Sequence, residues 1–224
     1  MAEQTRYVPA AGREFLTPFY DGFVRLTMRE QTFRLRVVAQ VAEGLGPGGR
    51  VLEIGCGTGA LTERLAAAAP EAEVTGLDGD ERVLERARAR LAGTGVELVA
   101  ASVDEMPFGD AAFDRVVASL LLHHLDDATK AAALSEAHRV LAPDGSLHIA
   151  DWGPPAGVVP RLGFAALRAL DGRENTAAHA EGRLPEMVEA AGFTAVERRG
   201  RLATVLGTVE MIAAERTDTG VGIA

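Results

Sequence analysis

Residues 51–65 read VLEIGCGTGALTERL, an apolar run that carries one acid and passes directly into three glycines. The apolar residues 51–54 predict a strand, and Gly55, Gly57 and Gly59 predict a tight loop at its end. A run rich in Ala and Leu follows and predicts a helix. This order lets backbone approach a nucleotide-like ligand, because a Cβ at those glycines would collide with it. The segment therefore indicates the kind of molecule that is bound.

The composition limits the classes of protein to which this chain can belong. Of the 224 residues 47% are hydrophobic, which favours one domain with additions. The net charge of −9 is spread along the chain and disfavours a partner bound through many phosphates, so we expect no nucleic-acid partner. A single cysteine excludes an internal disulfide. No run approaches the ~20 apolar residues of a membrane span, and nothing near Met1 resembles a signal peptide, so we expect a cytoplasmic protein.

Strands and helices alternate through the middle of the chain. We expect strands at residues 51–54, 73–77, 96–100, 113–118 and 146–150, and helices at residues 58–69, 80–91 and about 127–141. Asp80 is expected to cap the second helix, and Asp126 or Asp127 the third. Pro143-Asp144-Gly145 predicts a turn before the fifth strand. Such alternation is typical of a parallel sheet with helices on both faces.

The flanking regions are expected to be additions to this sheet. Two helices are expected within residues 12–44, an irregular stretch with a helix near residues 161–170 follows the fifth strand, and a helix opens at Leu184-Pro185-Glu186. Residues 193–199 and 203–213 predict a closing hairpin. The expected division is an N-terminal helical lid at 1–44, a ligand-binding domain at 45–216 with a cap insertion at about 152–183, and a disordered tail at 217–224.

The glycine loop by itself fits two kinds of cofactor. It satisfies the dinucleotide fingerprint G-x-G-x-x-G/A as well as the tighter pattern G-x-G-x-G. Asp78 ends the second strand, where a carboxylate can accept hydrogen bonds from ribose hydroxyls in either case. Glu53, two residues before Gly55, would repel a diphosphate and attract a sulfonium cofactor with a free amino group. An NAD(P)-dependent oxidoreductase remains the alternative.

Several segments together resemble the class I S-adenosylmethionine-dependent methyltransferases, in the quinone-biosynthesis-like group that acts on small molecules. They are VLEIGCGTG, GLDGD, the MPF…FD segment, SLLLHHL, RVLAPDGSLHIADWG, and AGF followed by TVLGTVEM. The resemblance covers nearly the whole chain. It implies an α/β fold with a doubly wound, seven-stranded sheet of order 3-2-1-4-5-7-6, in which strand 7 is antiparallel. It also implies S-adenosyl-L-methionine as the methyl donor, S-adenosyl-L-homocysteine as the product, and a small, partly apolar acceptor.

The resemblance implies a first group of cofactor-binding residues around the glycine loop. Gly55, Cys56 and Gly57 would back the methionine part of the cofactor. Asp78 would hold the ribose, and Gly79 would lie beside the adenine.

A second group follows the third and fourth strands. Many relatives have an aspartate at the position of Ser102, where it binds the adenine amino group. Here the resemblance implies a contact from Ser102 or Asp104, with the Val103 backbone still available. Ser119 and Leu120, at the end of the fourth strand, would line the reacting centre.

The N-terminal region adds candidates that the residues themselves suggest. Tyr20 lies in an aromatic-rich segment and is expected to face the cofactor carboxylate or methyl, or else to dock its helix on the sheet. Arg29 is expected to pair with the same carboxylate, with a surface pair to Glu30 as the alternative. Candidate walls of the acceptor site are Phe19, Tyr20, Trp152 and Phe164.

Two adjacent histidines follow the fourth strand at the carboxyl edge of the sheet, where ligands lie in open α/β folds. Methyl transfer needs mainly alignment and exclusion of water, and a general base helps when the nucleophile is a hydroxyl or an acidic carbon. We expect at most one to face the acceptor, with His124 favoured over His123; both being structural is the alternative. Asp151 and His179 are further candidates at the pocket mouth. No metal is expected, and a homodimer is left open.

Overall fold

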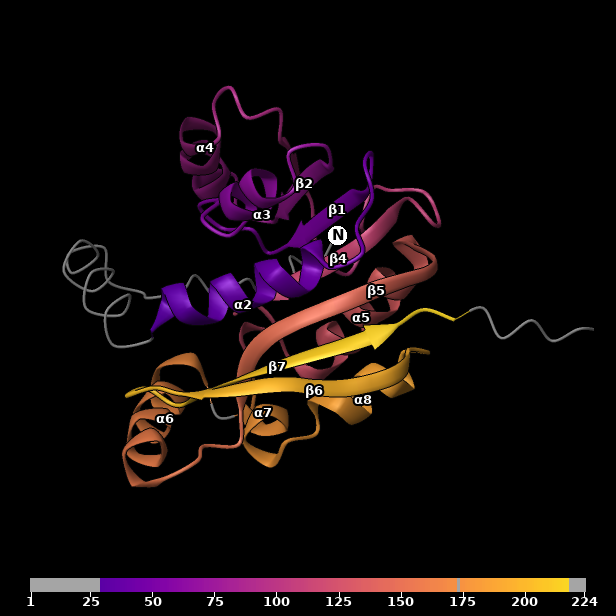
Figure 1. Cartoon of the computed structure of the whole chain (residues 1–224). Helices are drawn as coiled ribbons and strands as arrows, with labels where there is room; N and C mark the ends of the chain where they lie inside the picture. Colours follow the sequence, from indigo (N-terminus) through magenta and orange to yellow (C-terminus); the bar gives the residue numbers. More distant parts are fainter. Residues whose placement is uncertain (1–28, 173, 218–224) are drawn as a thin grey trace, which may run out of the picture.

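A computed structural model describes residues 29–172 and 174–217 of the chain (Figure 1). Most of the predicted lid, with Phe19 and Tyr20, lies outside the described residues, as do residues 218–224 of the predicted tail. Among the described residues, none of the helices has the length and apolar character needed to span a membrane.

Seven strands of the described chain form one sheet in the order β3-β2-β1-β4-β5-β7-β6. Their bounds are β1 Arg50–Ile54, β2 Glu73–Asp78, β3 Glu97–Ala100, β4 Phe113–Ser119, β5 Leu141–Gly153, β6 Thr194–Ala203 and β7 Thr208–Glu215. Strands β1 to β5 run parallel, whereas β7 is antiparallel to both β5 and β6. The predicted order and the direction of the seventh strand are confirmed.

Helices cover both faces of this sheet. They are α2 Glu30–Ala42, α3 Thr62–Ala68, α4 Glu81–Arg90, α5 Asp127–Val140, α6 Val158–Asp171, α7 Ala177–Glu181 and α8 Leu184–Ala190, with a 3-10 turn, η1, at Leu122–His124. Successive residues of a strand point to opposite faces, and β4 shows this plainly. Its Val116 lies in the apolar cluster with α5 and α8, while Val117 lies in the cluster with α2 and α3. The sheet is therefore doubly wound.

The described part of the predicted lid packs on the sheet. Helix α2 places Phe33, Val37, Val38 and Val41 in the second apolar cluster, together with Trp152 of β5. These residues recur at helical spacing, which is why one face of the helix is apolar. The described part of residues 1–44 thus helps to form the core.

Three predicted boundaries were wrong. The helix after the glycine loop begins at Thr62 because the loop continues to Gly59, which has a φ of 73°. The turn expected at Pro143–Gly145 is a bulge inside β5, because the Asp144 N–H and the Gly145 carbonyl bond to the backbone of Arg216. Strand β6 extends to Ala203, and the hairpin turn follows it.

Candidate functional site

The glycine loop lies at the carboxyl end of β1 and leaves an open surface. Gly55 and Gly57 have φ values of 68° and 54°, a backbone conformation that side chains rarely adopt. A Cβ at Gly55 would lie 2.5 Å from the Leu121 side chain, which would have to move to accommodate it. A Cβ at Gly57 would meet no atom of the described residues within 4 Å. The space in front of Gly57 is therefore available to a ligand.

Asp78 connects the ends of β1 and β2. Its Oδ2 accepts a hydrogen bond from the Gly57 N–H at 2.8 Å, and its Oδ1 accepts one from the Asp80 N–H at 2.9 Å. The cap of α4 is Asp80, whose Oδ1 accepts the Arg82 N–H, as predicted. Each carboxylate oxygen of Asp78 has a further lone pair that can accept from a ligand hydroxyl.

Glu53 and Cys56 have buried side chains. The Thr62 hydroxyl donates to Glu53 Oε2 at 2.5 Å, so the carboxyl is turned toward α3. Burial raises the pKa of Glu53 to about 7, although the Thr62 hydrogen bond opposes this rise. Burial also raises the pKa of the Cys56 thiol, which packs over Gly76 of β2. The Cys56 backbone, and not its thiol, is therefore what this residue can offer a ligand.

Replacing Glu53 with glutamine should remove a pH dependence of stability. The pKa of Glu53 is higher in the folded chain, about 7, than the ordinary value of 4.5 for a glutamate, so the folded state binds more protons between these values. Stability of the wild type should consequently fall as pH rises through that window. We expect Glu53→Gln to be more stable at pH 8 by about 1–3 kcal/mol, and to lose this advantage near pH 4.

Urea unfolding at the two pH values measures the difference. The exposed Glu85, replaced by glutamine, is the matched control and should behave as the wild type. The same pH dependence in Glu53→Gln and the wild type would contradict the assignment.

The residues expected near an adenine lie together after β2 and β3. The Ala101 N–H donates to the Asp78 carbonyl at 3.2 Å, which brings the two strand ends side by side. The Ser102 hydroxyl donates to the Asp104 carboxylate. Ser102 and Gly79 are exposed, Asp104 is half-buried, and the Val103 side chain is buried.

The two histidines lie on η1, directly after β4. Ser119 ends β4, and Leu120 has a φ of 52° while its N–H donates to the Ala150 carbonyl at 2.8 Å. We call residues 121–125 the histidine turn. Both residues expected to line the reacting centre, Ser119 and Leu120, are half-buried beside it.

Asp151 of β5 holds one side of the histidine turn. The His123 Nδ1–H donates to its Oδ1 at 2.7 Å, and the N–H groups of Leu122 and Trp152 donate to the same carboxylate at 2.8 and 2.7 Å. Burial alone would raise the pKa of Asp151, but His123, His179 and the hydrogen bonds lower it below its usual value. The carboxylate is therefore ionised and fully bonded.

The two histidines have different surroundings. His123 is buried against Asp151, while His124 is half-buried with its ring centroid 3.9 Å from that of His123. Burial, and to a smaller extent the neighbouring His123, lowers the pKa of His124 to about 3. His124 is thus a neutral imidazole at physiological pH.

Other candidates are distributed around this centre. His179 of α7 donates from Nδ1 to the Trp152 carbonyl at 2.8 Å, and burial lowers its pKa. Two of the four predicted wall residues, Trp152 and Phe164, have ring centroids 6.0 Å apart and are buried in the apolar cluster with α2. Arg29 is exposed at the start of α2. Among the described residues, no group of three or more His, Cys, Asp or Glu side chains could hold a metal ion.

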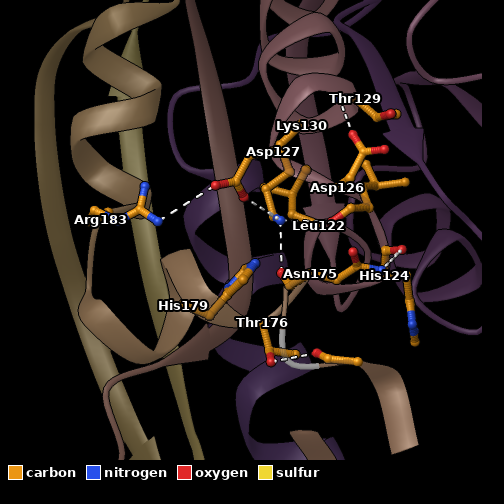
Figure 2. Close-up of polar contacts among 12 residues, drawn as sticks. Leu122, His124, Asp126, Asp127, Thr129, Lys130, Asn175, Thr176, His179 and Arg183 are labelled. Carbon is orange, nitrogen blue, oxygen red and sulfur yellow. Dashed lines mark hydrogen bonds and ion pairs between the residues drawn. The ribbon is translucent and has the colours of Figure 1, made fainter.

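Sequence reasoning missed Lys130 and Asn175, which bond to the histidine turn (Figure 2). Lys130 shares the buried face of α5 with Ala133, Leu134 and Ala137. A lysine at that helical spacing on an apolar face was the signal available in the sequence.

Comparisons with known proteins agree on one family. Residues 51–145 match the family described as "Methyltransferase domain". A demethylmenaquinone methyltransferase of Clavibacter sepedonicus is 34% identical over 190 residues, which cover 76% of this chain and 74% of that protein. A ubiquinone/menaquinone biosynthesis C-methyltransferase of Desulfotalea psychrophila is 36% identical over 129 residues, 57% of this chain. That match spans only 50% of the Desulfotalea protein's length.

Solved structures show the same fold. A putative methyltransferase of Bacillus halodurans has a TM-score of 0.65 at 22% identity, covering 82% of this chain and 98% of that one. A SAM-dependent methyltransferase of Aquifex aeolicus has a TM-score of 0.62 at 21% identity, covering 82% and 89%. Together with the sequence relatives, the sheet order and the glycine loop, they place the chain: it belongs to the class I S-adenosylmethionine-dependent methyltransferases, in the quinone-biosynthesis-like group.

Proposed function

We propose that this chain transfers a methyl group from S-adenosyl-L-methionine to a small, partly apolar acceptor. The observation that carries the proposal is the Asp78 carboxylate, held by the Gly57 N–H beside the open space of the glycine loop. A carboxylate fixed in this way can accept hydrogen bonds from both ribose hydroxyls. Backbone without a Cβ at Gly57 fits the methionine part of the same molecule.

The other cofactor contacts follow from the ends of the strands. Gly55 and the Cys56 backbone would complete the surface behind the methionine part. Gly79, Ser102, Val103 and Asp104 would surround the adenine. Glu53 would act on the cofactor's positive charge through its field, because its carboxyl is buried against Thr62.

The remaining candidates would bound the reacting centre. Ser119 and Leu120 would line it, and Arg29 and Tyr20 remain the proposed partners of the cofactor carboxylate. The bound cofactor supplies an electrophilic methyl group on a sulfonium, so the protein's tasks are alignment and exclusion of water.

We propose His123 as the general base for an acceptor hydroxyl or acidic carbon. Asp151 accepts a hydrogen bond from the His123 Nδ1–H, and this tautomer places the imidazole lone pair on Nε2. A buried carboxylate that orients an imidazole in this way is a recurring device for proton transfer. The order expected from the sequence is thereby reversed: His124, with its low pKa, would serve as a neutral wall.

The acceptor is proposed to combine an acidic group with an apolar body. Trp152, whose ring centroid lies 6.2 Å from that of His123, would supply an aromatic wall, with Phe164 packed behind it. Relatives of this chain are demethylmenaquinone methyltransferases and malonyl-[acyl-carrier protein] O-methyltransferases. A reduced naphthoquinone is therefore a reasonable first acceptor to test.

Two measurements test the proposal. Calorimetry should show micromolar binding of S-adenosylhomocysteine and none of NADH, and methyl-labelled donor should transfer its label to 1,4-naphthoquinol or to a component of a metabolite extract. Binding of NADH without S-adenosylhomocysteine would overturn the proposal. The family and relatives named above are methyltransferases, so they give no support to the oxidoreductase alternative.

We propose that the enzyme is cytoplasmic. We also propose that it has no nucleic-acid partner, because the net charge of −9 opposes binding to phosphates. Gel mobility with duplex DNA and RNA at low salt tests this point, and a shifted band would contradict it. Light scattering would decide whether the enzyme is a monomer or a homodimer.

A further inference from the structure

A buried lysine connects the cap to the histidine turn. Lys130 of α5 has a relative exposure of 0%, and its Nζ donates to the carbonyls of Leu125 and Asn175 at 2.7 and 2.8 Å. It also donates to Asp127 Oδ1 at 3.0 Å. An ammonium group has three protons, so each has one acceptor. Figure 2 shows these contacts converging on Lys130 from α5 and from the loop before α7.

The Asn175 side chain adds a second link. Its Nδ2 donates to the His124 carbonyl at 3.1 Å, one residue before the Leu125 carbonyl that binds Lys130. Asn175 lies between α6 and α7, within the predicted cap. Two consecutive carbonyls of the histidine turn are thus bonded, one by Asn175 of the cap and the other by Lys130, which also binds the Asn175 carbonyl.

The opposite side of the turn is held by β5. Asp151 binds the Leu122 N–H and the His123 imidazole there. The histidine turn is therefore fixed from two directions, by a strand of the sheet and by the cap. A short 3-10 turn has few hydrogen bonds of its own, so these external bonds set its orientation.

Packing alone does not account for this arrangement. Burying an ammonium group costs several kcal/mol, and an apolar side chain of similar size often stabilises a protein at least as well. Asn175 likewise uses its side-chain amide to donate a hydrogen bond to one backbone carbonyl. Groups of this kind fix a geometry more than they add stability.

We propose that Asn175 and Lys130 are positioning residues for methyl transfer: they hold the carbonyls of His124 and Leu125 so that the histidine turn keeps His123 against Asp151. The cap and the base are thereby coupled, because Asn175 belongs to the cap. This inference rests on the role given to the histidine turn in the proposed function.

Two substitutions of Asn175 separate positioning from bulk. Asn175→Ala removes the side chain, while Asn175→Asp keeps its shape but presents only oxygen to the His124 carbonyl. Both leave the Asn175 backbone carbonyl available to Lys130. The control is Leu162→Ala, which shortens a side chain of α6 within the cap that is 70% exposed and takes no part in the hydrogen bonds to the turn.

The readout is NMR titration of the histidine rings in the full chain with S-adenosylhomocysteine present. The groups that face His124 are His123, His179 and Asp151. In both Asn175 variants the His124 ring should become more exposed to solvent. Its pKa should therefore rise toward that of an exposed histidine, about 6.5. Leu162→Ala should titrate as the wild type.

Lys130→Met is expected to move the same signals and also to lower the melting temperature. Wild-type titration in both Asn175 variants would overturn the inference. A lower melting temperature of Lys130→Met with unchanged histidine signals would overturn it as well. Binding of S-adenosylhomocysteine should be equal in all variants, because Gly57 and Asp78 lie on other elements. If the wild type itself does not bind S-adenosylhomocysteine, the proposed function is contradicted, but the titration result still stands.

Discussion

Replacement of Asp78 by alanine should weaken binding of S-adenosylhomocysteine by about 1.5–3 kcal/mol, roughly 10- to 150-fold. The carboxylate has two tasks that alanine cannot perform. It accepts the N–H groups of Gly57 and Asp80, which fixes the loop, and it would accept the ribose hydroxyls. Isothermal titration calorimetry with the purified variant measures the change directly.

Matched variants show which task matters. Asp78→Asn keeps one acceptor oxygen and the volume, so we expect an intermediate loss of affinity. Asp80→Ala removes the cap of α4 and should cost about 1 kcal/mol of stability without changing the affinity. An unchanged dissociation constant in Asp78→Ala would remove Asp78 from the binding site.

Much of the fold could be predicted because its signals are local. The alternation of apolar runs with helical stretches gave the parallel part of the sheet, and the glycine loop marked its centre. The resemblance supplied the strand order. The bulge in β5 could not be predicted, since Pro143-Asp144-Gly145 is a turn signal locally. The backbone of Arg216, more than seventy residues later, satisfies its hydrogen bonds and keeps it in the strand.

The candidate site divides in the same way. Asp78 and the glycines lie within one unit of the chain, so their proximity follows from a strand, a loop and the next strand. The bond between His123 and Asp151 joins residues 28 positions apart, and that between Lys130 and Asn175 joins residues 45 apart. Such pairs depend on how β5 and the cap pack, which spacing along the chain does not reveal.

Of the substitutions proposed here, Asp151→Ala should cause the largest loss of stability, about 3–5 kcal/mol in urea unfolding at pH 7. The N–H groups of Leu122 and Trp152 and the His123 imidazole would lose their acceptor in a buried place. Asp126→Ala is the control, because Asp126 is an exposed carboxylate that caps α5. Its loss should cost about 1 kcal/mol. Equal losses in the two variants would contradict the network.

The pH dependence gives an independent check on Asp151. Its pKa is lower in the folded chain than the ordinary value of 3.8 for an aspartate, so its ionised form stabilises the fold above that value. This contribution should disappear as pH falls below about 4, and Asp151→Ala should therefore flatten the acid side of the stability profile.

Asp151→Asn tests the role of charge at constant volume. Its amide leaves one of the two backbone N–H groups without an acceptor in either orientation, so its stability should lie between those of the wild type and the alanine variant. The low-field proton signal of His123 Nδ1 should move upfield in Asp151→Asn, because the charge-assisted bond is lost, and an unmoved signal would show that Asp151 does not orient the base.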